Sequence, residues 1–330
     1  MIHDDIPTDT FFTLPDHADQ SSALRRTGIE IEFAGLSVAE AAQVVQHLWG
    51  GIIEPVDDRD LNVKGGQFGD VKVELDISLQ KKWAEDLAAQ ALGGLVPVEI
   101  VTAPLAQGDL PQADRLVGAL RKAGALGTRA RLAYGFGLHL NPELPGPDGV
   151  GLVAVARAYA LLEPWLRQSD PIDPARRVLP FVDPWPLDLT DALAQTARWT
   201  VAQFARTYTA HAPSRHYGLD LLPALQHLHA EALAAVPVAH LKGARPTFHY
   251  RLPEARLDEP GWSIAYEWNR WCLIEAVAIN SAVLEDLAQR WQDHRTALVP
   301  RGRDWAAQVE TVLAAANLRP HLGACTGQRR

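Results

Sequence analysis

Five short stretches of the chain alternate apolar residues with acidic or basic ones. The first, TGIEIEF, would place Glu30 and Glu32 on one face of a β-strand and its large apolar residues on the other. Successive positions on one face lie roughly 7 Å apart, so two carboxylates there repel each other unless a cation or strong hydrogen-bond donors separate them. A half-solvated edge strand explains one such stretch, so the meaning of the pattern depends on whether other strands repeat it.

The alternation recurs in VKVELDISL, VPVEIV, FGLHLN and FHYRL. A merely solvated face would mix Lys, Thr, Ser and Gln, whereas carboxylates and imidazoles dominate here. Carboxylate oxygens suit Mg²⁺ or Mn²⁺, and an imidazole shifts the preference toward Mn²⁺ or Zn²⁺. A single histidine is more often a hydrogen-bonded structural residue, but the stretches together predict a metal site. The ionisable side chains on these polar faces are Glu30, Glu32, Lys72, Glu74, Asp76, Glu99, His139, His249 and Arg251.

Length and composition indicate a soluble globular protein. The 330 residues, 47% of them hydrophobic, suffice for one large domain or two ordinary ones. No apolar run reaches the about 18 residues of a membrane span, and a net charge of −9 disfavours nonspecific binding to nucleic acid or anionic membranes. Only two cysteines occur and no secretory signal is recognisable. We therefore expect a cytoplasmic protein without nucleic-acid or membrane partners, and the sequence leaves its oligomeric state open.

The predicted strands and helices mix without strict βαβ alternation, which favours an α+β fold with an antiparallel or mixed sheet. Glycine turn signals within LNVKGGQFGDVKVELDISL predict a hairpin, and Ser37 with Glu40 forms a capping-box pattern at the start of a helix. The helical patterns cover residues 37–49, 81–92, 109–122, 150–166, 189–208, 220–235, 262–292 and 303–316.

Three regions are expected along the chain. Residues 1–22 read as a flexible acidic lead-in, residues 23–318 as a single catalytic domain and residues 319–330 as a polar tail. Within the domain, the proline-rich segment 170–187 cannot be regular, and loops of this length are often lids or binding loops.

The order GIEIEF, DISL, VEIVTAPL, GLHLN, RHYGLDLLPAL and FHYRLP resembles the amidoligase family, across roughly residues 24–290. This family belongs to the carboxylate–amine ligases with the glutamine synthetase and glutamate–cysteine ligase fold. The resemblance implies a curved, mainly antiparallel sheet with helices on its outer face, and an active site that uses ATP and Mg²⁺, with Mn²⁺ as an alternative. In such enzymes a carboxylate attacks the γ-phosphate, and an amine displaces phosphate from the resulting acyl phosphate.

Carried over to this chain, the resemblance assigns roles to individual residues. Glu32, Asp76 and Glu99 would hold the ion nearest the substrate carboxylate, and Glu74 competes with Asp76 for that role. Glu30 and His139 would hold the ion that bridges the ATP phosphates. Arg251 would contact the transferred phosphoryl group, which fits a reaction that depends on positioning and charge neutralisation. The residues expected to take part directly in catalysis are Arg251, Glu32 and Glu99.

The last strand departs from the family pattern. The family usually has Glu-x-Arg there, with the Glu completing the second metal site, and this chain has His249 at the Glu position. A histidine can still ligate, but the site loses one negative charge and would hold Mg²⁺ less tightly. Lys242 and Arg245, just upstream, are candidates for phosphate contacts or ordinary soluble loop residues.

We therefore expect an ATP-dependent ligase that joins a small-molecule or peptide carboxylate to an amine. His249 motivates one rival, a noncatalytic binding or scaffold protein that keeps the ligase fold. The mixed carboxylate and imidazole ligand set motivates a second, a metal-dependent hydrolase.

Overall fold

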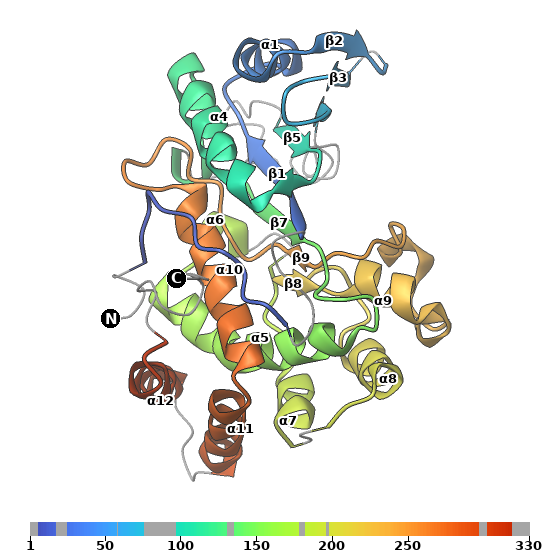
Figure 1. Cartoon of the computed structure of the whole chain (residues 1–330), viewed down its shortest axis with the longest axis vertical. Helices are drawn as coiled ribbons and strands as arrows, with labels where there is room; N and C mark the ends of the chain where they lie inside the picture. Colours follow the sequence, from blue (N-terminus) through green and yellow to red (C-terminus); the bar gives the residue numbers. More distant parts are fainter. Residues whose placement is uncertain are drawn as a thin grey trace.

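The computed structural model describes residues 6–17, 25–57, 59–75, 97–130, 135–177, 182–195, 198–296 and 302–318. Within this part of the chain the fold is α+β, as predicted, with one open antiparallel sheet and helices packed against it (Figure 1). None of the described helices combines the length and apolar character that crossing a membrane requires.

The sheet is built around β1, which pairs with β5 on one side and β7 on the other. The described strands follow the order β2-β3-β4-β5-β1-β7-β9-β8, and β6 pairs separately with β1. Ladder pairings between strands are all antiparallel, and the predicted hairpin is confirmed as β3 paired with β4. The strands are β1 (Arg26–Phe33), β2 (Ile52–Pro55), β3 (Leu61–Lys64), β4 (Val71–Leu75), β5 (Val98–Thr102), β6 (Leu105–Ala106), β7 (Leu138–Pro142), β8 (Leu219–Asp220) and β9 (His249–Tyr250).

The helices cover the apolar face of this sheet. At one end α1 and α4 lie over the strands, and at the other the long α5 and α10 run beneath them, with α11 and α12 beyond (Figure 1). The described helices are α1 (Val38–Trp49), α4 (Leu110–Ala123), α5 (Val150–Ser169), α6 (Pro174–Arg177), α7 (Leu187–Gln195), α8 (Val201–His211), α9 (Leu222–Leu228), α10 (Ile264–Ile279), α11 (Ser281–Thr296) and α12 (Gly302–Ala315).

Aromatic side chains form the contact between the sheet and α5 and α10. The Tyr250 ring on β9 lies 5.2 Å from that of Trp271 and 6.2 Å from that of Tyr159, measured between centroids. All three side chains are fully buried. Because Tyr250 points into this core, the strand alternation turns its neighbours His249 and Arg251 toward the opposite face.

Three predicted helices differ from the structure. The pattern 262–292 is two helices, because Asn280 leaves helical geometry and its side chain accepts a hydrogen bond from the Val283 N–H. The pattern 189–208 is divided into α7 and α8, since Thr200 forms a capping box with Gln203 that starts a new helix. The pattern 220–235 forms an α-helix only to Leu228 and continues as a 3₁₀ turn. The predicted helix 81–92 lies outside the described residues.

The sequence predicts a flexible lead-in over residues 1–22, but the described part of it, residues 6–17, packs along α10. Phe12 is buried, its N–H donates to Asn269 Oδ1 at 2.9 Å, and its carbonyl accepts from Trp268 Nε1 at 2.7 Å. His17 Nε2 lies 3.0 Å from Glu275 Oε2. The acidic composition of the segment gave no indication that these few residues anchor it to α10.

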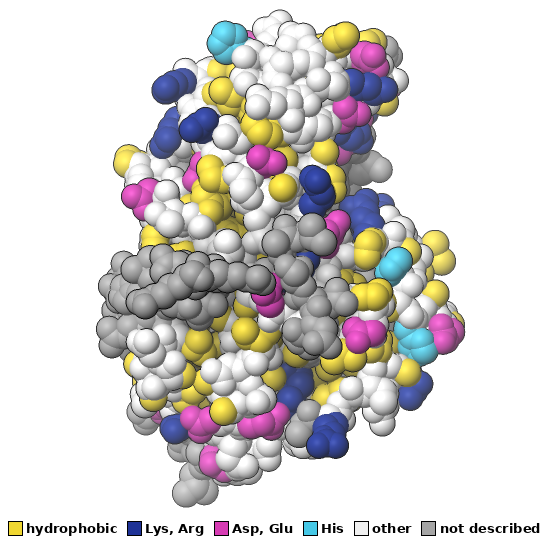
Figure 2. Space-filling view, viewed as in Figure 1, with side chains coloured by type: hydrophobic (Ala, Val, Ile, Leu, Met, Phe, Trp, Pro, Cys, Tyr) yellow, Lys and Arg dark blue, Asp and Glu magenta, His cyan; other side chains and the backbone are white. Residues whose placement is uncertain are grey.

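Charged side chains of both signs appear on the face of the molecule that Figure 2 shows. In Figure 2, basic and acidic side chains alternate over the visible coloured atoms, without one large acidic face.

Candidate metal centre

The register of the strands brings the predicted polar residues into one row. Glu32 on β1 lies opposite Glu99 on β5, and Glu99 lies opposite Glu74 on β4. On the other side of β1, Glu30 lies opposite His139 on β7. Residues opposite each other in an antiparallel pair share a face, so these side chains all project away from the hydrophobic core.

The row continues across β7, β9 and β8. Leu140 lies opposite Tyr250, which places Asn141 and His249 on the same face one step along the two strands. His249 in turn lies opposite Asp220 on β8. The polar face therefore extends without a break from β4 to β8.

Two groups of side chains on this face could each hold a cation. The first is Glu30, His139 and His249, and the second is Glu32, Glu99 and His139. Within each group, the potential ligand atoms lie within 4.8 Å of one another. Two ligands of one Mg²⁺ ion can be at most about 4.2 Å apart and two ligands of a larger ion somewhat more. The donor set thus fits a divalent cation after a small contraction.

His139 belongs to both groups but serves only one ion at a time. Its Nδ1 lies 2.7 Å from Glu30 Oε2, and its Nε2 lies 3.5 Å from Glu32 Oε1. A neutral imidazole has a single lone pair, since the other nitrogen carries the proton. The two groups are therefore neighbouring sites that share one histidine, whose lone pair is available to only one of them.

Asn141 determines which nitrogen of His249 can bind a metal. The Asn141 amide nitrogen donates to Glu30 Oε1 at 2.8 Å, which turns its carbonyl oxygen toward His249 Nδ1 at 2.6 Å. That oxygen can only accept, so Nδ1 of His249 carries the proton and Nε2 keeps the lone pair. Burial lowers the pKa of His249 well below its ordinary value, with the charge of Arg251 acting in the same direction and Glu30 opposing it. The ring is therefore neutral near pH 7, as a ligand must be.

Glu30 is ionised despite its burial. Burial alone would raise its pKa, but the hydrogen bonds from His139 and Asn141 lower it well below the ordinary value. Glu32 is held differently, because its Oε2 accepts a 2.6 Å hydrogen bond from the Gly137 N–H. Glu30 is thus fixed by residues of the neighbouring strand β7, and Glu32 by Gly137, which precedes that strand.

The sequence analysis missed Arg215 and Asp220, which lie beside Arg251. The Arg215 Nε donates to Asp220 Oδ2 at 3.1 Å, and the Arg251 Nη1 donates to the Arg215 carbonyl at 3.0 Å. Burial raises the pKa of Asp220, while Arg215 and Arg251 oppose that rise. Both residues lie in RHYGLD, a segment that contributes to the family resemblance, but no role was predicted for its ionisable side chains.

The remaining predicted residues are not in either ligand group. Glu74 shares the face but its carboxylate is paired with Lys72 Nζ. Asp76 lies outside the described residues. Lys242 and Arg245 are exposed in the loop that precedes β9.

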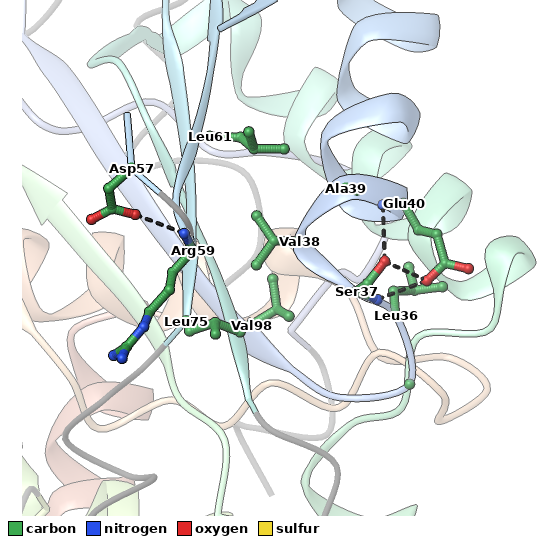
Figure 3. Close-up of a pocket in the computed structure, with 11 residues that line it drawn as sticks. Leu36, Ser37, Val38, Ala39, Glu40, Asp57, Arg59, Leu61, Leu75 and Val98 are labelled. Atoms are coloured by element: carbon green, nitrogen blue, oxygen red, sulfur yellow. Dashed lines mark hydrogen bonds between the residues drawn. The ribbon is translucent and has the colours of Figure 1, made fainter. Parts of the chain in front are cut away.

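A cavity of about 680 Å³ lies on the opposite, apolar side of the sheet, beside the start of α1. Figure 3 shows Val38, Leu61, Leu75 and Val98 directed toward it. Of its polar side chains, Ser37 and Glu40 form the capping box of α1, and Asp57 accepts from the Arg59 N–H. The ionisable ligands lie on the other face, so this cavity is separate from the candidate metal centre.

A comparison with known protein families matches residues 23–273 to one described as "Putative amidoligase enzyme". The chain belongs to this family. The match contains every described strand and both ligand groups, so the amidoligase resemblance of the sequence is confirmed. A comparison with curated proteins found no match.

Proposed function

We propose that this amidoligase family member joins a carboxylate to an amine in an ATP- and Mg²⁺-dependent reaction, with Mn²⁺ as an alternative ion. The observation that carries the proposal is the pair of ligand groups that meet at His139 on one face of the sheet. Family membership supports the ligase activity. The glutamine synthetase type of fold and the acyl-phosphate route belong to the proposal.

The proposed ligands divide between the two groups. Glu32 and Glu99 would hold the ion beside the substrate carboxylate, together with Asp76 or Glu74. Glu30, His139 and His249 would hold the ion beside the phosphates of ATP. Bound there, the ions would neutralise the oxygens of the carboxylate and of the phosphates.

Arg251 would contact the phosphoryl group during its transfer. It follows β9 on the same face as His249 and is buried, so its charge acts where water screens it little. A carboxylate oxygen of the substrate would attack the γ-phosphorus, and ADP would leave. The amine would then attack the acyl carbon, phosphate would leave, and the amine nitrogen would lose a proton. Lys242 and Arg245 stay candidates for phosphate contacts in this scheme.

The test is ADP release with sets of candidate acids and amines in the presence of Mg²⁺. A ligase sustains ADP release over many turnovers only when both substrates are present, and it yields one amide for each ADP. A hydrolase would cleave its substrate without nucleotide, and a scaffold protein would bind ions or ATP without turnover. Either of these outcomes would overturn the proposal.

A further inference from the structure

The proline-rich segment 170–187 contains a buried arginine that reaches the candidate metal centre. Within it, the single helical turn α6 carries Arg176, whose side chain is only 3% exposed. The Arg176 Nη1 donates to the Phe136 carbonyl at 2.5 Å, and its Nη2 donates to the Arg251 carbonyl at 2.6 Å. One guanidinium therefore holds together the chain just before β7 and the chain just after β9.

The peptide between Phe136 and Gly137 connects Arg176 to a candidate metal ligand. Its carbonyl accepts from Arg176, and its N–H donates to Glu32 Oε2 at 2.6 Å. A charged donor on the carbonyl polarises the peptide and strengthens the bond that its N–H makes. Arg176 thus acts on the position of Glu32 through one peptide group.

Other donors fix the same peptide. The Thr128 hydroxyl donates to the Phe136 carbonyl at 2.7 Å, and the Ala255 N–H donates to it at 3.0 Å. The Glu32 N–H returns a 3.0 Å bond to the Gly137 carbonyl. So many bonds on one short stretch leave Glu32 little freedom to move.

Gly137 shows how closely Arg176 approaches the ligands. A Cβ atom added at this position would lie 2.7 Å from His139 Nε2 and 2.9 Å from Arg176 Nη1. The imidazole and the guanidinium therefore occupy the space that a side chain at position 137 would need. Among the charges that act on Arg176, that of Glu32 opposes most strongly the lowering of its pKa by burial.

The segment that carries Arg176 is itself anchored. The Asp173 N–H donates to Glu254 Oε1 at 2.8 Å, and Asp170 accepts from Arg256 Nη2 at 2.8 Å. Arg256 also pairs with Glu254 at 3.1 Å. These contacts join the segment to the chain that follows β9, so Arg176 is held on a fixed support.

We propose that Arg176 is a positioning residue of the metal centre, which sets the places of Glu32 and Arg251 through the Phe136–Gly137 peptide and the Arg251 carbonyl. This inference rests on the proposed binding of divalent ions by the cluster. Arg176 does not contact substrate, because it is buried and both of its terminal nitrogens are already bonded to carbonyls.

The direction in which Mn²⁺ affinity changes distinguishes a positioning role of Arg176 from a purely electrostatic one. Arg176→Gln removes a positive charge beside the carboxylates, so a purely electrostatic role would make the protein bind cations more tightly. A positioning role predicts the opposite, a loss of Mn²⁺ affinity of about tenfold or more, as is typical for residues that orient ligands. Arg176→Lys should also lose affinity, because its single ammonium cannot span both carbonyls.

The experiment is calorimetric titration of Mn²⁺ into full-length protein, combined with the electron paramagnetic resonance spectrum of bound Mn²⁺ and a thermal melt of each variant. The matched control is Arg177→Gln, because the adjacent Arg177 is exposed and should leave Mn²⁺ binding unchanged. Absence of Mn²⁺ binding in the wild-type protein would refute the proposed function itself. Normal or tighter binding by Arg176→Gln, beside a wild-type protein that binds, would refute the positioning role alone.

A second variant covers the case in which Arg176→Gln does not fold. Gly137→Ala leaves Arg176 in the chain but forces His139 or the guanidinium to move. We expect weaker Mn²⁺ binding and an altered Mn²⁺ spectrum for this variant as well. An unchanged affinity and spectrum in a folded Gly137→Ala protein would contradict the proposed role of this contact.

Discussion

At the scale of single residues, three carboxylates share a small space around one imidazole. Glu30, Glu32 and Glu99 lie around His139, and Glu32 is buried. Like charges at such distances repel, and low exposure limits the screening by water. The cluster thus concentrates negative charge, which is usual for sites that bind cations or perform chemistry.

Glu32→Gln tests this interpretation, because it removes charge with little change of volume and keeps an acceptor for the Gly137 N–H. We expect ligase turnover to fall by roughly 100-fold or more, in line with the loss of one electrostatic contact to a transition state. The melting temperature in metal-free buffer should stay the same or rise, because repulsion is relieved. ADP release and a thermal melt measure the two effects.

The matched control is Glu54→Gln on β2, an edge strand of the same sheet, where Glu54 is half exposed beside Lys64. It should leave turnover unchanged. Near-normal turnover of Glu32→Gln would rule out a role for Glu32 in binding the ion.

We expect His249 to set the metal preference of its group. Imidazole favours Mn²⁺ over Mg²⁺ relative to a carboxylate, which is a harder and charged ligand. His249→Glu should therefore tighten Mg²⁺ binding more than Mn²⁺ binding and lower the ratio of Mn²⁺ to Mg²⁺ affinity. Paired calorimetric titrations of both ions at one pH give this ratio. An identical ratio in the two proteins would place His249 outside the coordination shell.

At the scale of elements, Asn280 decides where a long apolar pattern divides into two helices. The helical pattern continues through residues 262–292 because α10 is buried on nearly all sides and α11 buries one side, so the pattern alone cannot show the break. The side chain of Asn280 accepts from the Val283 N–H at 3.2 Å, as a helix N-cap does. Asn280→Ala should lower the free energy of unfolding by about 1 kcal/mol, measured by denaturant titration. Asn280→Asp, which keeps the cap, should lose much less.

The start of β1 is tied to α10 by a buried ion pair. The Arg25 Nη1 donates to Glu275 Oε2 at 2.6 Å, and His17 and Trp271 also bond to this carboxylate. Although burial would raise it, the pKa of Glu275 is lowered by Arg25 and by the hydrogen bond from His17. A lowered carboxylate pKa contributes stability above the ordinary value of about 4.3, and that contribution is lost as the pH falls through the lowered pKa.

Glu275→Gln should therefore cost about 3 kcal/mol in the free energy of unfolding at pH 7, because it leaves Arg25 buried without its partner. The difference from the wild-type protein should shrink as the pH is lowered below about 4.3. Urea titrations of both proteins at pH 7 and at several acidic values measure it. A difference that stays constant over this range would show that the charge of Glu275 contributes nothing to stability.

At the scale of the whole molecule, the sequence predicts which residues share a strand face, and the structure adds how the strands are arranged. Alternation within a strand fixes which residues share a face, so the polar faces of β1, β5 and β7 were predictable. Register and strand order depend on distant contacts, so alternation cannot place Glu99 opposite Glu32; only the family resemblance grouped the two residues beforehand. Arg176 could not be found from sequence, because its partners Phe136 and Arg251 lie 40 and 75 positions away in the chain.

Because one sheet carries both the ligands and the hydrophobic core, binding of a cation should stabilise the entire fold. A ligand that binds only the folded state at 100 times its Kd adds about 2.7 kcal/mol of stability. For a chain of 330 residues, with an unfolding entropy of about 2.1 cal/mol/K per residue, this corresponds to a rise in Tm of about 4 °C. Melts with Mn²⁺ at multiples of the measured Kd test this. Glu54→Gln should show the full rise and Glu32→Gln a much smaller one, because only Glu32 belongs to a ligand group. If Mn²⁺ raised the Tm of both variants equally, Glu32 would not belong to the site that binds the ion.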